Sequence, residues 1–541
     1  MNTPPFPYVL AKYRSESNRK YAGNPWVEAL PGLPDDATLA RALAHLPRFD
    51  PTERELAAPV RIQMLDTLQQ LVVPLPRLVR LARGVLKMMH TSYGPRKPFS
   101  KKDNETLQSL YELQQSGDFV SAKQADLDGQ HTLSLIGASG CGKSFGLKRI
   151  QGLFPPAIYH ESLGKWQLPY IFIEMPYDGE SVHTLASEIF AELDRLMPDA
   201  GYTRLYTDRK GSNAEQRLAK ALWLAYQHAV GMIFIDEHQN QPSIGNEPNP
   251  DSTRKRKTAT EKHPGKETPL AKLLITASNT SHMPLLMSGT VEMKAMLSPR
   301  FSRARRMAGR GSGTWGPLER SGNLAKPGEF ELLLMGLWNY QWVRQPVKLT
   351  EQWSEFMFKL TQGIPDIMVK LFESSQEAAI AGKGETLSQE LVEAVLAKEF
   401  VATEFGLTAL RTKDRVMLDV VTDLYQPDIV ERAQNANQQF VLPKSKAAPI
   451  VAKKPFAMPG SASAAASSSG ATSAPSIDAG SSSGSARRGR PLRPGPVAAV
   501  VSAAVATASD MRATLTPGAG LAGLNVADLG QTFRTPPALR T

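Results

Sequence analysis

The chain has 541 residues, of which 41% are hydrophobic, and a formal net charge of +11. This length and composition predict a mostly globular protein of several domains with at least one large core. The single cysteine excludes intramolecular disulfides, and the lack of a signal-peptide pattern or a long apolar segment predicts a cytoplasmic protein with no membrane contact.

The positive charge is concentrated in the C-terminal part. From residue 441 onward the chain has 11 basic and 3 acidic residues, a net charge of +8, which leaves +3 for residues 1–440. A DNA site in the folded part must therefore come from a local cluster of basic residues, because the overall charge there is nearly balanced.

The first 125 residues divide into an arm and a helical extension. Residues 1–50 mix proline, tyrosine and charges and predict an N-terminal arm with little helix. Residues 51–125 have a helical pattern that is broken at Pro74, Pro76 and Gly94. Basic residues recur here at helical spacing, which fits either a stripe that contacts phosphates or a solvated helix face. The candidates for DNA contact are Arg77, Arg80, Arg83, Lys87 and Lys97.

Residues 126–345 are predicted to form an α/β nucleotide-binding core. Residues 137–144 (GASGCGKS) fit the phosphate-loop pattern G-x-x-x-x-G-K-[ST], between an apolar strand at 133–136 and a helix at 145–153. In such a loop the backbone N–H groups surround the phosphates, Lys143 neutralises their charge, and Ser144 offers a hydroxyl to Mg²⁺. The predicted ATP-binding residues are Gly137, Ser139, Gly140, Cys141, Gly142, Lys143 and Ser144.

A later strand supplies the acidic residues that a P-loop ATPase requires. After a strand at 169–174 and helices at 181–196 and 213–230, the apolar run 231–235 ends in Asp236 and Glu237. We expect Asp236 to hold Mg²⁺ through water and Glu237 to orient or deprotonate the attacking water. The next strand, 285–290, places a polar residue at its tip to sense the γ-phosphate, with Thr290 favoured over Ser288.

Two basic clusters flank this last strand. The polar loop 241–268 contains Arg254, Lys255 and Arg256, which contact DNA or form a solvated charge cluster. Beyond the strand lie Arg300, Arg303 and Arg305, in the place where ring ATPases carry an arginine that reaches the nucleotide of a neighbouring subunit. This run holds more arginines than one such contact needs, so interface or DNA contacts are expected as well.

The C-terminal third divides into a lid and a tail. Residues 346–440 predict a small helical lid, with helices at 351–361, 365–381, 388–399, 409–423 and 428–433. Residues 441–541 are rich in alanine, serine, glycine and proline and predict a low-complexity, disordered tail. Arg488 and Arg490 in this tail belong either to a minor-groove AT-hook or to a basic linker.

Together these motifs resemble the AAA+ ATPases, and more narrowly the TnsC family of regulators of TnsABC-type cut-and-paste transposons. The resemblance spans about residues 10–435. It depends on residues 21–31 (YAGNPWVEALP), 135–160, 235–239 (IDEHQ), 289–290 with 304–306, and 363–372 (GIPDIMVKLF). The phosphate loop and the Asp-Glu pair are generic, whereas the N-terminal and lid stretches are specific. The lid position that often carries a sensor arginine in AAA+ proteins holds Asp366, with Lys370 one turn later.

The resemblance implies an AAA+ fold of a parallel sheet with a helical lid, binding ATP and Mg²⁺. It further implies a ring or helical oligomer of this chain on double-stranded DNA in the bacterial nucleoid, with hydrolysis dissolving misplaced assemblies. The partners implied are a TnsD/TniQ-type target selector, contacted by the N-terminal arm, and the TnsA and TnsB transposase. The alternatives are a helicase loader or other DNA-remodelling ATPase, and a nucleotide-binding scaffold that does not hydrolyse ATP. Because Cys141 lies in the phosphate loop, we also expect alkylation to block ATP-dependent assembly and ATP to protect the thiol.

Overall fold

The computed structural model describes residues 8–119, 132–175, 181–206, 213–236, 280–290 and 313–421, together with Leu274 and Ser278. All of them belong to one compact unit. None of the described helices is long and apolar enough to cross a membrane.

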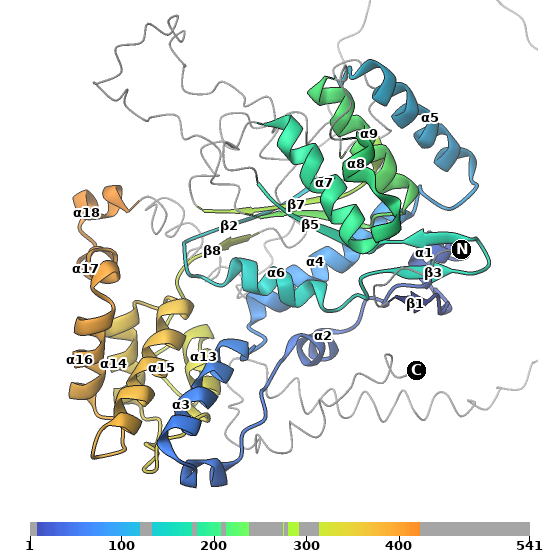
Figure 1. The fold of residues 1–541 in the computed structure, drawn as a ribbon. Coiled ribbons are helices and arrows are strands. Elements are labelled where there is room, and N and C mark those ends of the chain that lie inside the picture. Colours follow the sequence, from blue (N-terminus) through green and yellow to red (C-terminus); the bar gives the residue numbers. More distant parts are fainter. Residues whose placement is uncertain are drawn as a thin grey trace, which may run out of the picture. The chain divides into compact units, whose positions relative to one another are not determined.

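The centre of the fold is a five-stranded sheet in the order β5-β6-β7-β2-β8, and all its strand pairs are parallel (Figure 1). The central strands are apolar runs because a parallel sheet is covered on both faces. The three strands predicted after the phosphate loop correspond to β5, β6 and β7, whereas the short β8 was not predicted. The strands are β2 (Thr132–Gly137), β5 (Tyr170–Glu174), β6 (Met232–Asp236), β7 (Leu285–Gly289) and β8 (Gly313–Trp315).

Helices cover both faces of this sheet, which gives a three-layer arrangement. Strand β6 shows why, since Ile233 and Ile235 belong to one buried cluster and Met232 and Phe234 to the other. Figure 1 shows α5, α7, α8 and α9 on one side of the sheet and α4 and α6 on the other. These helices are α4 (Pro76–Tyr93), α5 (Lys101–Ser116), α6 (Lys143–Gln151), α7 (Val182–Leu196), α8 (Tyr202–Tyr206) and α9 (Ala214–Gln227).

Local signals in the sequence fix where several of these helices begin. Ser181 caps α7 by accepting a hydrogen bond from the Thr184 backbone N–H, at 3.1 Å. Asn213 and Gln216 form a reciprocal capping box at the start of α9. Pro76 occupies the first turn of α4, where its missing N–H leaves no intrahelical bond unmade. The predicted starts of α7 and α9, at 181 and 213, agree with the structure within one residue.

The N-terminal segment contains more structure than the sequence indicates. Strand β1 (Val9–Leu10) adds in parallel to a hairpin of β3 (Ile158–His160) and β4 (Lys165–Gln167), and α1 (Pro25–Glu28) and α2 (Asp36–Leu43) follow. Trp26 is 4% exposed and packs edge-on against His160, with 4.6 Å between ring centroids. Gln167 donates to the Trp26 carbonyl at 2.9 Å. The arm is therefore held by long-range contacts that its composition does not reveal.

The lid has a core of its own, separate from the two clusters at the sheet. Its helices are α14 (Glu351–Thr361), α15 (Pro365–Ala381) and α16 (Gln389–Glu399), and α13 (Glu329–Trp338), which precedes the predicted lid boundary at 346, packs into the same core. N-terminal elements complete this core, namely α3 (Ala58–Leu65) and the 3₁₀ turn η2 (Asp66–Gln70). Buried Arg61 of α3 forms a two-pronged ion pair with Glu385, both distances being 3.0 Å, and donates to the Trp342 carbonyl at 2.9 Å.

The helix predicted at 409–423 is replaced by two shorter helices, α17 (Glu404–Thr412) and α18 (Arg415–Val420). Lys413 interrupts them because it adopts a left-handed conformation with φ of 54°, which ends α17. Besides η2, the described residues include the 3₁₀ segments η1 (Pro51–Glu55), η3 (Pro198–Ala200) and η5 (Val401–Thr403). The helix predicted at 428–433 lies outside the described residues.

Candidate nucleotide-binding site

The candidate site lies at one edge of the parallel sheet. In the β2–β7 pair Ile136 lies opposite Gly289, and in the β7–β6 pair Met287 lies opposite Ile235. Since the carboxyl ends of parallel strands meet at the same edge, the phosphate loop, Thr290 and Asp236 all emerge there. This is the edge where open α/β sheets bind ligands.

The loop between β2 and α6 has the geometry of a phosphate cradle. Gly140 and Gly142 adopt left-handed φ angles of 72° and 82°, which other residues reach only with strain. Helix α6 begins at Lys143 without a side-chain cap, so its first N–H groups point out of the helix end. The Lys143 ammonium donates to the carbonyls of Gly137 and Ala138, both at 2.9 Å, and is thereby held over the loop.

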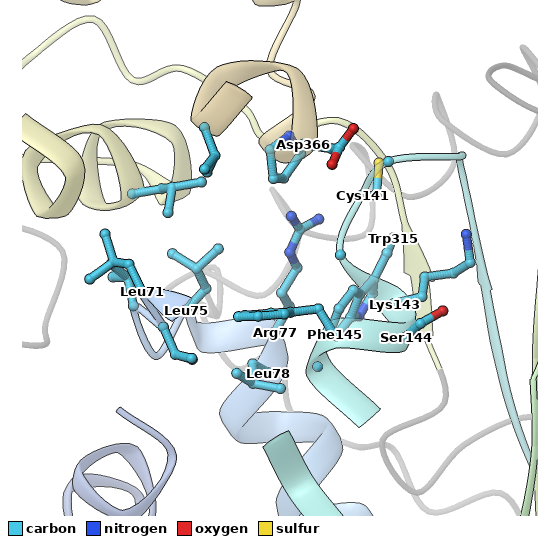
Figure 2. A pocket seen from close by; sticks show the side chains of 18 of the residues that line it. Leu71, Leu75, Arg77, Leu78, Cys141, Lys143, Ser144, Phe145, Trp315 and Asp366 are labelled. Atoms are coloured by element: carbon cyan, nitrogen blue, oxygen red, sulfur yellow. The ribbon is translucent and has the colours of Figure 1, made fainter. Parts of the chain in front are cut away.

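A pocket of about 480 Å³ opens beside this loop, within the size range of small-molecule sites. Ser139, Gly140, Cys141, Gly142, Lys143 and Ser144 line it on one side, and Asp236 and Thr290 line it as well. Figure 2 shows Leu71, Leu75 and Leu78 facing the loop residues across the pocket. The site thus brings together most of the residues predicted from the phosphate-loop pattern, the Asp-Glu pair and the sensor strand.

The apolar wall of the pocket was not foreseen from the sequence. It comes from the segment between η2 and α4, with further residues from β8 and the lid: Leu68, Leu71, Val73, Leu75, Leu78, Trp315, Leu333 and Val369. The only local signal was the proline-punctuated apolar run 71–76, which indicates a turn but no ligand. An apolar wall beside a phosphate cradle is suited to a nucleobase.

The polar groups of the pocket fit a nucleotide with Mg²⁺. Asp236 is 4% exposed, and its carboxylate and the Ser144 hydroxyl are oxygen donors of the kind that Mg²⁺ prefers. The buried hydroxyl of Thr290 has no hydrogen-bond partner among the described residues, as is also true of Ser288. Only Thr290 of these two lines the pocket, where a phosphate oxygen can satisfy its hydroxyl.

The lid closes on the phosphate loop through the start of α15. The backbone N–H of Asp366 donates to the Gly140 carbonyl at 3.2 Å. The Asp366 carboxylate accepts from the Lys370 ammonium at 2.8 Å, so the lid presents an internally neutralised ion pair to the pocket. Pro365, Asp366, Val369 and Lys370 all line it.

The environment of Cys141 differs from the expectation of a reactive thiol. Its side chain is 2% exposed, and burial raises the pKa of the thiol to about 11, although Arg77 and Lys143 pull it down slightly. The thiolate is the reactive form, so a thiol held protonated and covered reacts slowly. We therefore expect alkylation of Cys141 to be slow, and protection of the thiol by ATP stays a prediction.

The basic stripe predicted on the N-terminal extension is divided by the structure. Arg80 and Lys87 are exposed on α4, and Lys97 is exposed beyond it. Arg83 pairs with Asp36 of α2. Arg77, at the first turn of α4, instead lines the nucleotide pocket. The remaining candidates lie outside the described residues: Glu237, Arg254, Lys255, Arg256, Arg300, Arg303, Arg305, Arg488 and Arg490.

Comparison with known proteins agrees with this geometry. Residues 126–297 match a protein-family model described as AAA domain. No curated protein matches the chain. Among solved structures, the crystal structure of Cdc6p from Pyrobaculum aerophilum is similar at 14% identity and a TM-score of 0.32, covering 58% of this chain and 70% of that chain. The chain has the AAA+ P-loop ATPase fold, with a parallel sheet between helical layers.

Proposed function

We propose that this protein is an ATP-dependent DNA-binding regulator of transposition. In this proposal it oligomerises on target DNA and links a TnsD/TniQ-type target selector to the TnsA and TnsB transposase, and ATP hydrolysis to ADP and phosphate disassembles the oligomer. The observation that carries the ATPase part is the convergence of Lys143, Ser144, Asp236 and Thr290 on one pocket. The resemblance of the N-terminal and lid stretches to the TnsC family supports the transposition part.

Each pocket residue has a defined task in this proposal. The loop N–H groups and Lys143 bind the phosphates, and Ser144 and Asp236 hold Mg²⁺, which neutralises charge on the phosphates when bound. Glu237, directly after Asp236, orients or deprotonates the attacking water. Thr290 donates its hydroxyl to the terminal phosphate and so distinguishes ATP from ADP. An arginine among Arg300, Arg303 and Arg305 reaches the nucleotide of the neighbouring subunit.

DNA binding in this proposal is sequence-independent and directed at phosphates. Arg80 and Lys87 are exposed on one face of α4, at a spacing of two helical turns, and Lys97 extends the basic surface. Contacts of this kind release counterions, so affinity falls steeply with salt. The specific arm residues 21–31 pack against the β3–β4 hairpin through Trp26, which leaves the exposed side of the arm for the selector.

The decisive experiment measures binding to random duplex DNA with ATP, ADP and a non-hydrolysable analogue. We expect assembly with ATP and the analogue, weak binding with ADP, and loss of affinity as salt rises. Lys143→Ala should abolish the nucleotide dependence, whereas Lys148→Ala, an exposed lysine on the same helix, should preserve it. Equal binding in all three nucleotide states would contradict the switch.

Hydrolysis is tested separately through Glu237. Glu237→Gln should retain ATP binding but stop turnover, and the oligomers on DNA should then persist. If this variant behaved like the wild type, a scaffold that does not hydrolyse ATP would replace the switch. Strand displacement by the wild type would indicate a helicase-loader or remodelling role instead.

A further inference from the structure

Arg77 is placed to contact the nucleotide itself. It comes from the first turn of α4, far in sequence from the phosphate loop, yet it lines the same pocket. Figure 2 shows its guanidinium pointing into the pocket, between the apolar side chains of Leu71 and Leu75 and the loop residues. Its side chain is 13% exposed, so the charge is largely shielded from bulk water.

The neighbours of Arg77 fix its orientation and leave part of the guanidinium available. Nη1 donates to the Gly316 carbonyl at 2.8 Å, and the guanidinium lies 5.0 Å from the centroid of the Trp315 ring. Nε lies 3.7 Å from a Glu329 carboxylate oxygen, which is a loose ion pair. Nη2 has no hydrogen-bond partner among the described residues. A planar guanidinium that is held at Nε and Nη1 presents Nη2 as a positioned donor for phosphate oxygens.

Among the described residues, two other cations line the pocket, and each of them already has a partner. Lys143 is bonded to carbonyls of its own loop and serves the terminal phosphates. Lys370 of the lid is paired with Asp366, at the position where an AAA+ lid often carries its sensor arginine. Because Asp366 neutralises Lys370, this lid pair brings no net positive charge toward the phosphates, and Arg77 is the remaining described cation between the loop and the apolar wall.

We propose that Arg77 contacts the α- and β-phosphates of the bound nucleotide and supplies, from the N-terminal helix α4, the cis cation that the lid does not provide. This proposal rests on the proposed function only in that the pocket binds a nucleotide. It also removes Arg77 from the set of candidate DNA contacts and assigns it to ATP. ATP and ADP both carry α- and β-phosphates. The contact with Arg77 should therefore strengthen the binding of ATP and of ADP to the same extent.

The test measures dissociation constants of the full-length protein for ATP, ADP and adenosine by calorimetry. Arg77→Met should raise the dissociation constants for ATP and ADP by about 10- to 100-fold, which is the usual range for the loss of a charged hydrogen bond. Adenosine has no phosphate, so its affinity should not change. Damage to the pocket as a whole would instead lower the affinity for adenosine by the same factor, and that result would overturn the proposal.

Arg80→Met, one turn further along the same helix, is the matched comparison. Arg80→Met should keep the wild-type affinity for ATP. For duplex DNA, it should reduce the steepness with which the logarithm of the association constant falls with the logarithm of the salt concentration by about one. Arg77→Met, saturated with ATP, should keep the wild-type salt dependence. Unchanged ATP affinity in Arg77→Met overturns the proposal while leaving the ATPase function intact. If the wild type binds ATP but no DNA, the proposed regulatory function is wrong, and the calorimetry alone decides the role of Arg77. If the wild type binds no nucleotide, both are wrong.

Discussion

The thiol of Cys141 gives a quantitative test of how tightly the phosphate loop is packed. It is the only cysteine of the 541-residue chain, so any thiol reagent reports on this one position. The side chain is 2% exposed, and burial raises its pKa from an ordinary value of 9.0 to about 11. Since only the thiolate attacks an alkylating reagent, both facts slow the reaction.

The expected size of the effect follows from the ionised fraction. At pH 8 a thiol with a pKa of 9 is about 10% ionised, and one with a pKa of 11 about 0.1%, which alone slows the reaction about 100-fold. Steric exclusion of the reagent slows it further. We therefore expect native protein to react with iodoacetamide at least about 100 times more slowly than protein unfolded in guanidinium, and more slowly still with ATP bound, because the nucleotide holds the loop closed.

The assay follows alkylation by mass spectrometry at several pH values, with the unfolded chain as the reference for an accessible thiol. In the native protein the rate should keep rising tenfold per pH unit up to about pH 10, whereas the unfolded chain should level off above about pH 9. A native rate equal to the unfolded rate would refute the burial of Cys141. An unchanged native rate on adding saturating ATP would place the nucleotide elsewhere.

Three further predictions concern stability and the lid. Arg61→Met should lower the free energy of unfolding by about 3 kcal/mol because it removes a fully buried guanidinium that donates to the Trp342 carbonyl and to Glu385. Arg344→Met, half exposed beside the same carboxylate, should cost less than about 1 kcal/mol, and urea melts measure both. Gly140→Ala should weaken ATP binding, measured by nucleotide titration, because the added Cβ would lie 2.9 Å from a lid side chain. Gly164→Ala is the control, since it has a similar positive φ but open space around it. It should cost only about 1 kcal/mol of stability in thermal melts. Burial lowers the pKa of His228 to about 4, so the unfolded chain binds the proton first and stability falls as the pH drops from about 6.5 toward 4. Between pH 7.5 and pH 5 this loss should be at most about 2 kcal/mol, and urea melts of His228→Gln should show a smaller pH dependence.

The elements that the sequence predicts correctly are those determined by residues close together in the chain. The phosphate loop is a contiguous pattern, and β6 reads as a strand because every residue of the run is apolar. The bounds of α15 match the expectation of 365–381, since Pro365 opens the helix and Gly382 follows it. In each case a handful of neighbouring residues carries the whole signal.

The parts that were not found depend on contacts between distant segments. Much of the apolar wall of the pocket comes from residues 68–78, which meet the phosphate loop only after the chain has folded. Burial of Trp26 likewise requires the hairpin at His160. Periodicity correctly aligned Arg77 with Arg80 on α4, but it could not show that the first turn of this helix ends at the pocket. Composition and spacing report which residues share a face, and they do not report what that face meets.

Helix α4 connects three parts of the molecule that the function must coordinate. It begins at Pro76, places Arg77 of its first turn in the nucleotide pocket, exposes Arg80 and Lys87 along its length, and ends at Tyr93. The Tyr93 hydroxyl donates to the Ala229 carbonyl at 2.6 Å, just before β6 and Asp236, and the Tyr93 carbonyl accepts from Asn24 of the arm at 2.6 Å. At about 1.5 Å per residue, a helix of 18 residues is a stiff rod of about 27 Å. A contact between Arg77 and the phosphates would therefore set the position of the basic face and of the arm together. Because ATP and ADP share these phosphates, such a route would connect occupancy of the pocket, and not the difference between ATP and ADP, to the basic face and the arm.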